Sequence, residues 1–169
     1  MTTRVKVWSS LIAVGVLVAV FLLGRPQAVR ESGASLGAVS SVVTVLAAEE
    51  SDFDFGSISM AAGLVRHSYR VRNMSDAPVM ITRMYTSCMC TNASFIRGSE
   101  RRGPFGMPGH GMVPTLRESI APGEEVTIEA VFDPAAHGPA GVGQVNRSIY
   151  LENDAGEPLE IGFTALVTP

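Results

Sequence analysis

Alternation of apolar and polar residues with a period of two dominates the chain after about residue 42. In residues 65–71, valine, histidine and tyrosine alternate with arginine and serine, and residues 126–132 and 159–167 alternate in a similar way. This period is typical of strands that bury one face, because successive side chains point to opposite sides of a sheet. No segment after residue 24 shows the spacing of an amphipathic helix. The chain is therefore expected to fold mainly from strands.

Weaker strand patterns and turn-forming residues complete this picture. The weaker segments are residues 42–47, 53–55, 79–86 and 145–152. Residues that preset turn dihedrals or tolerate positive φ cluster at positions 73–78, 121–124, 133–134 and 153–156. About seven short strands at this spacing predict an all-β, immunoglobulin-like β-sandwich over residues 41–169.

Residues 7–24 form an uncharged apolar run that is nearly long enough to span a membrane. As a helix, about 18 residues extend roughly 27 Å. Basic residues flank the run, and it lacks a good small-residue cleavage site. We therefore expect a cytoplasmic N-terminus at residues 1–6, a transmembrane anchor or uncleaved signal at residues 7–24, and a flexible tether at residues 25–40. The membrane is thus one expected partner.

The charges of the chain are distributed unevenly. The first 30 residues contain Arg4, Lys6, Arg25 and Arg30 and no acidic residue, whereas the whole chain carries a formal net charge of −3 at pH 7. The part after the apolar run is therefore acidic. An acidic domain lacks the cationic surface that releases counterions from nucleic acid, so nucleic acid is excluded as an expected partner.

Short motifs occur in an order that resembles a known family. They are FDFGSI at residues 53–58, HSYRVRN at 67–73, APVMI at 77–81, TSCMCT at 86–91, APGE at 121–124 and VFDP at 131–134. This order resembles the bacterial domain-of-unknown-function family 1573 over about residues 43–167. The resemblance implies an immunoglobulin-like sandwich that is exported or lipid-anchored, and it implies no established activity.

Two features depart from the family pattern. Met89 stands where a glycine is expected between the cysteines, and an insertion at about residues 94–119 separates the cysteine turn from the proline-glycine turn. Either departure is consistent with a changed use of the site. Together with the apolar run, the resemblance predicts a single-pass protein of the bacterial cell membrane with its C-terminal domain outside the cytoplasm. Its expected protein partner is another envelope protein.

Cys88 and Cys90 are the only cysteines, and three states remain open for them. A disulfide is the usual state of an even number of cysteines in an oxidising compartment. In an extended strand, residues i and i+2 lie about 6.6 Å apart on one face, so this disulfide needs a local turn and stores strain that favours reduction. The alternatives are a chelating pair for a soft metal such as Cu(I) or Zn(II), or free and partly buried thiols.

Further metal ligands are available in the glycine-rich segment at residues 106–112. This segment carries Met107, His110 and Met112, a set of soft and borderline ligands of the kind that Cu(I) accepts. The predicted metal site therefore consists of Cys88, Cys90, Met107, His110 and Met112. Methionine is also a common filler of apolar gaps, and the glycine and proline content explains the flexibility of the segment without any metal.

No set of residues indicates catalysis, so an enzyme is not expected and no catalytic residue is assigned. A nucleophile needs a base and an orienting third group, and the three histidines are scattered. His67 is expected in the core or an interface, and His137 is expected as a solvated turn residue. Two functions stay open: a non-catalytic module that binds another envelope protein, and a copper, zinc or thiol-redox site centred on Cys88 and Cys90.

Overall fold

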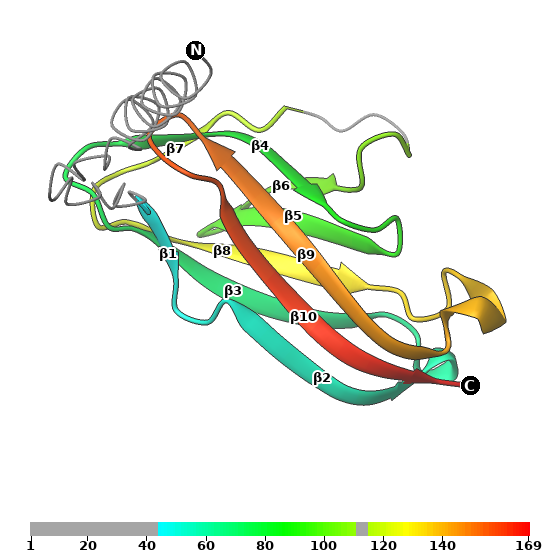
Figure 1. Ribbon diagram of the computed structural model, residues 1–169. Coiled ribbons are helices and arrows are strands. Elements are labelled where there is room, and N and C mark those ends of the chain that lie inside the picture. The colour runs from blue at the N-terminus through cyan, green and yellow to red at the C-terminus, as the bar shows by residue number, and fades with distance from the viewer. Residues whose placement is uncertain (1–43, 111–114) are drawn as a thin grey trace, which may run out of the picture. The chain divides into compact units, whose positions relative to one another are not determined.

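The computed structural model describes residues 44–110 and 115–169, which fold into a sandwich of two five-stranded sheets (Figure 1). One sheet has the strand order β1-β3-β8-β5-β6, and the other has the order β2-β10-β9-β4-β7. The elements are β1 (Leu46–Ala48), β2 (Asp52–Ser59), η1 (Met60–Ala62), β3 (Val65–Asn73), β4 (Val79–Thr86), β5 (Thr91–Arg97), β6 (Glu100–Phe105), β7 (Glu118–Ile120), β8 (Glu125–Phe132), η2 (Gly138–Gly141), β9 (Gly143–Asn153) and β10 (Leu159–Thr168). The predicted all-β two-sheet fold is confirmed, although the described residues contain ten strands where about seven were predicted.

The expected N-terminal segments at residues 1–6, 7–24 and 25–40 lie outside the described residues. Within the part of the chain that the structure describes, no helix combines the length and the apolar character needed to cross a membrane. The anchor at residues 7–24 therefore stays a prediction.

Strand β3 shows how the alternating sequence builds the sandwich. Tyr69 and Val71 are buried, whereas Arg70 and Arg72 face solvent. β3 pairs with β8 along the whole of β8, and β10 lies between β2 and β9 in the other sheet. The Tyr69 hydroxyl donates a hydrogen bond of 2.6 Å to the Gly162 carbonyl oxygen on β10, and burial raises the pKa of Tyr69 above its ordinary value. The two sheets are thus joined by a polar contact inside the core.

Gly162 allows β10 and β9 to approach each other closely beside Arg147. A Cβ atom at position 162 would lie 2.8 Å from the Arg147 carbonyl oxygen, which is closer than carbon and oxygen atoms normally approach. On the other side, the Gly162 amide donates a hydrogen bond of 2.7 Å to the Ser51 carbonyl oxygen. A side chain at position 162 would therefore displace β9 at Arg147.

Ion pairs order the insertion after the cysteine turn, and one of them also connects it to the turn before β8. β5 and β6 form an antiparallel hairpin, so residues 94–105 are largely strand. Arg97 contacts Glu118 at 3.0 Å and Glu124 at 2.8 Å, and Arg102 contacts Glu118 at 2.9 Å. These contacts join β5 and β6 to the region of β7. The sequence pattern did not predict that this segment is ordered.

Glu129 on β8 is held by arginines from two other strands. Arg101 donates hydrogen bonds of 3.0 and 3.1 Å to its carboxylate, and Arg66 lies 3.4 Å away. The hydrogen bonds from Arg101, together with the charges of both arginines, lower the pKa of Glu129 against the opposing effect of burial. This contribution to stability is complete above the ordinary carboxyl pKa near 4.5 and is lost as the pH falls through the lower folded value.

We expect Glu129→Gln to remove this part of the acid dependence. In urea unfolding, the free energy of unfolding of the unmodified chain should fall more steeply between about pH 5 and about pH 3 than that of the variant. Glu160→Gln, at an exposed position of β10, is the matched control and should keep the original slope. Equal slopes for all three proteins would show that the Glu129 carboxylate does not contribute to acid unfolding.

Candidate thiol and metal site at the cysteine turn

The two cysteines lie in the turn that leads from β4 in one sheet to β5 in the other. Their sulfur atoms are at disulfide distance, and their Cα atoms are 5.3 Å apart. This Cα separation is shorter than the spacing in an extended strand, and it agrees with the predicted need for a local turn. The Thr91 amide closes the turn by donating a hydrogen bond of 3.1 Å to the Cys88 carbonyl oxygen. The buried Thr86 hydroxyl donates to the same oxygen at 3.0 Å.

Each sulfur has its own polar neighbour. Cys88 Sγ lies 3.2 Å from His137 Nε2, and Arg147 Nε donates a hydrogen bond of 3.2 Å to Cys90 Sγ. Cys88 is 9% exposed and Cys90 is 2% exposed. The pair therefore lies just under the surface between an imidazole and a guanidinium, and the Cys88 residue is slightly more exposed than Cys90.

His137 reaches the cysteine turn because the chain after β8 is attached to that turn. The Asp133 amide donates a hydrogen bond of 2.9 Å to the Cys90 carbonyl oxygen, directly after the pairing of Thr91 with Phe132. The following turn leads into η2 and carries His137. His137 is exposed, as expected for a turn residue, but its ring also contacts Cys88, and this contact was not predicted.

Cys88, Cys90 and His137 form a cluster that could hold a metal ion. Their ligand atoms all lie within 4.8 Å of one another. Across residues 44–110 and 115–169, this is the one group of three or more cysteine, histidine or acidic side chains that converges in this way. Thiolate and imidazole ligands suit soft and borderline metals such as Cu(I) and Zn(II). The cluster thus supports the prediction of a cysteine-based metal site in its general form.

The other predicted ligands are placed differently. His110 is exposed and does not belong to the converging group, and Met112 lies outside the described residues. The Gly106 carbonyl oxygen accepts a hydrogen bond of 3.2 Å from the Thr86 amide, so the segment that begins at Met107 starts beside the end of β4. The roles of Met107, His110 and Met112 as metal ligands stay predictions.

Sequence reasoning did not assign His137 or Arg147 to this site. A signal existed for Arg147, because it shares the inward-facing positions of β9 with the buried Val145 and Ile149, where a cation is unusual. The signal for His137 was weaker. It required the knowledge that the strand after the cysteines pairs with β8, and a single sequence does not show strand pairing.

A surface pocket adjoins the cysteine site. It is lined by His137, Arg147 and residues 140–145, apart from position 143. The Val142 side chain in this lining is 45% exposed, and Met89, between the two cysteines, is 50% exposed. The surface near the cysteine turn therefore carries two exposed apolar side chains beside polar ones.

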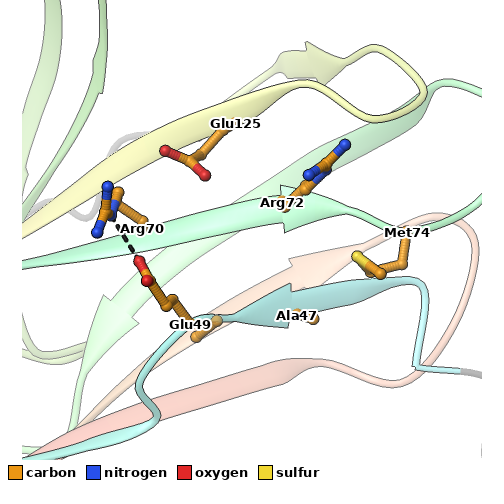
Figure 2. A pocket seen from close by; sticks show the side chains of 7 residues that line it. Ala47, Glu49, Arg70, Arg72, Met74 and Glu125 are labelled. Carbon is orange, nitrogen blue, oxygen red and sulfur yellow. Dashed lines mark ion pairs between the residues drawn. The ribbon is translucent and has the colours of Figure 1, made fainter.

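A second pocket lies beside the short edge strand β1 and includes residues of β3 and β8 (Figure 2). Glu49 and Arg70 form an ion pair of 2.6 Å there, and Arg72, Met74 and Glu125 contribute to the lining. Acidic side chains thus partly balance the cationic face of β3 in this pocket. Met74 adds an exposed apolar side chain to it.

The fold and the site define a β-sandwich domain with a cysteine pair in the turn between its two sheets. The model of the family described as "Protein of unknown function (DUF1573)" matches residues 46–103, which include this turn. The match confirms, over about a third of the chain, the resemblance that the motifs indicated. No curated protein matches the chain.

Solved structures show the same kind of sandwich at low sequence identity. A protein of unknown function from Porphyromonas gingivalis W83 aligns with a TM-score of 0.52 at 15% identity, covering 72% of this chain and 46% of that one. The PapD-like domain 7 of human CEP192 gives a TM-score of 0.46 at 9% identity, covering 85% and 98% of the two chains. The YadV chaperone gives 0.47 at 8% identity, covering 74% and 53%. Identities this low show the fold alone.

Proposed function

We propose that this chain is a membrane-anchored binding module outside the cytoplasm, and that its cysteine turn binds a soft metal ion, Cu(I). The observation that carries the proposal is the convergence of the Cys88 and Cys90 sulfurs with the His137 imidazole within 4.8 Å. The apolar run at residues 7–24 supports the anchor. The approach of the two sulfurs to disulfide distance is consistent with an oxidising compartment outside the cytoplasm.

The reduced turn is the binding form in this proposal, because metal ligation requires thiolates. The cluster offers three ligands, two sulfurs and one imidazole nitrogen. Soft thiolate ligands favour Cu(I), whereas a structural Zn(II) site almost always takes four ligands. The Arg147 guanidinium, 3.2 Å from Cys90 Sγ, offsets part of the negative charge that two thiolates bring to the site.

A competition titration tests the metal site. The full chain is purified in detergent, reduced without oxygen, freed of reductant and titrated with Cu(I) in the presence of a coloured Cu(I) chelator. We expect the reduced chain to withdraw one Cu(I) from the chelator and the disulfide form to withdraw none. A reduced chain that leaves all of the Cu(I) with the chelator would contradict the proposal. Stronger binding of Zn(II) in a parallel titration would contradict the choice of metal.

The pocket beside β1 favours a second function, the binding of another envelope protein without a metal. β1 is an edge strand of three residues, and an edge strand presents backbone groups with which another chain is able to pair. The charged and apolar residues of the Figure 2 pocket flank this edge.

Replacement of both cysteines separates the two functions. If the β1 edge is the functional surface, Cys88→Ser with Cys90→Ser should leave capture of the partner intact, apart from a loss of stability of about 1–2 kcal/mol for so short a disulfide loop. If the cysteine turn is the functional surface, the same variant should lose both the metal and any partner that depends on it.

A further inference from the structure

We propose that the Cys88–Cys90 disulfide reacts by thiol–disulfide exchange with the dithiol of another protein, and that Cys88 is the attacked sulfur while Cys90 leaves as a thiolate. This inference concerns the oxidised form of the turn. It deepens the proposed function by naming the reaction that releases the thiolates, and it rests on that function only in using the same two cysteines.

The two cysteines differ in their exposed fraction and in their neighbours. Exchange requires the attacking thiolate to reach one sulfur of the disulfide. Cys88 is 9% exposed and lies against the exposed His137, whereas Cys90 is 2% exposed and has Arg147 and Thr91 as neighbours. Both cysteines are largely buried, and attack at the more exposed residue, Cys88, is therefore favoured.

Charge selects the leaving sulfur. When the disulfide bond breaks, the electron pair stays on the leaving sulfur, and a neighbouring positive group stabilises the thiolate that forms. Arg147 Nε donates to Cys90 Sγ at 3.2 Å and belongs to a group that is always charged. The Cys90 amide donates to Cys88 Sγ at 3.3 Å, but a hydrogen bond from a charged donor is roughly twice as strong as one from a neutral donor. His137 Nε2, 3.2 Å from Cys88 Sγ, opposes this preference wherever it carries a proton, but as a neutral imidazole it is an uncharged donor and the weaker of the two side-chain donors.

The reaction balances with a protein dithiol as the reductant. One thiolate of the partner attacks Cys88 Sγ, a mixed disulfide forms, the Cys88–Cys90 bond breaks, and the electron pair passes to Cys90 Sγ. The second thiolate of the partner then attacks the partner's first sulfur in the mixed disulfide. A disulfide forms within the partner, and Cys88 leaves as a thiolate. The partner is oxidised to a disulfide and this turn is reduced to a dithiol. The two thiol protons of the partner pass to solvent or to the released sulfurs.

The surface beside Cys88 suits contact with such a partner. The pocket lined by His137, Val142 and Arg147 adjoins the disulfide, and Val142 is an exposed apolar side chain. Met89 adds a second exposed apolar side chain within the turn itself. His137 in this lining contacts Cys88 and Arg147 contacts Cys90, so a partner that docks here reaches the disulfide, and the greater exposure of Cys88 favours attack at that residue.

The first test identifies the attacked sulfur in the unmodified chain. The oxidised full chain is mixed with reduced glutathione, trapped within seconds by a fast thiol-alkylating reagent and analysed by fragment mass spectrometry, which separates the cysteines at Met89. We expect glutathione on Cys88 and the alkyl group on Cys90 in most of the trapped product. Glutathione mainly on Cys90, or equally on both, would overturn the inference.

The second test measures the role of Arg147 and needs no trapped product. The rate constant for reduction of the oxidised chain by dithiothreitol should fall about ten-fold or more in Arg147→Gln, since a factor of ten in rate corresponds to about 1.4 kcal/mol. Arg147→Lys, which keeps the charge, should restore most of the rate. Arg83→Gln is the matched control, because Arg83 pairs with Glu152 at 3.3 Å and not with a sulfur. An Arg147→Gln rate equal to that of the control, or faster, would overturn the inference.

Failure of the exchange and failure of the metal site are distinguishable, because both exchange measurements use metal-free protein. If the chain directs glutathione to Cys88 but binds no Cu(I), the exchange proposal stands and the metal-site proposal fails. If the chain binds Cu(I) but reacts equally at both sulfurs, the metal-site proposal stands and the exchange proposal fails.

Discussion

Replacing both cysteines with serine should abolish Cu(I) binding at concentrations where the reduced unmodified chain is saturated. A serine hydroxyl is a hard, neutral ligand, and soft thiolates are the ligands that select Cu(I). One imidazole, that of His137, would remain from the converging group. The measurement is the same competition against a coloured chelator, with circular dichroism to show that the variant is folded.

Variants of the histidines then decide between the ligand set from the structure and the set from the sequence. His137→Ala should weaken Cu(I) binding by at least about ten-fold, a loss of about 1.4 kcal/mol, because it removes the imidazole nearest the sulfurs. His110→Ala is the matched control, because His110 is an exposed histidine outside the converging group, and it should bind as the unmodified chain does. If His110→Ala weakens Cu(I) binding and His137→Ala does not, the metal ligands are those predicted in residues 106–112 and His137 is not one of them.

Phe163→Ala should have the largest effect on stability, a loss of about 3–5 kcal/mol in the free energy of unfolding. Phe163 lies on β10 between β2 and β9 and is 1% exposed. Its ring packs against Phe55 and Phe132, each with centroids 5.2 Å away, so it connects the two sheets. Truncation would leave a cavity at this contact, and a loss of this size is a large part of the stability of an ordinary domain.

Urea unfolding measures this loss. Leu166→Ala is the matched control on the same strand, because its side chain is largely exposed and its removal should cost well under 1 kcal/mol. Similar losses for the two variants would show that the core does not depend on the Phe163 ring.

The strands with one clearly apolar face were the part of the fold that sequence reasoning predicted well. Residues 65–71, 126–132 and 159–167 lie in β3, β8 and β10, and residues 79–86 coincide with β4. The sequence pattern does not predict β6, because five of its six residues are exposed and no apolar face marks it. Ion pairs from Arg97 and Arg102 hold this region, and pairs between distant residues leave no local pattern in a sequence.

The two cysteines of the candidate site were predictable from the sequence, but the histidine and the arginine beside them were not. The spacing of Cys88 and Cys90 marked the turn, because two sulfurs two residues apart must lie close together. His137 is 49 positions from Cys88, and it arrives there through the pairing of β5 with β8. Arg147, 57 positions from Cys90, arrives through β9. Contacts of this kind depend on the register of the sheets, which local periodicity does not determine.

The parallel pairing of β2 with β10 has a consequence for the rate at which the sandwich assembles. The paired residues of these strands are 109 or 110 positions apart, and Thr164, for example, donates a hydrogen bond to Asp54. Chain entropy makes contacts at such separation slow to form, and proteins dominated by them fold in milliseconds to seconds. During synthesis, β2 emerges long before the strand it pairs with. Its edge therefore stays open for association with other chains until β10 arrives.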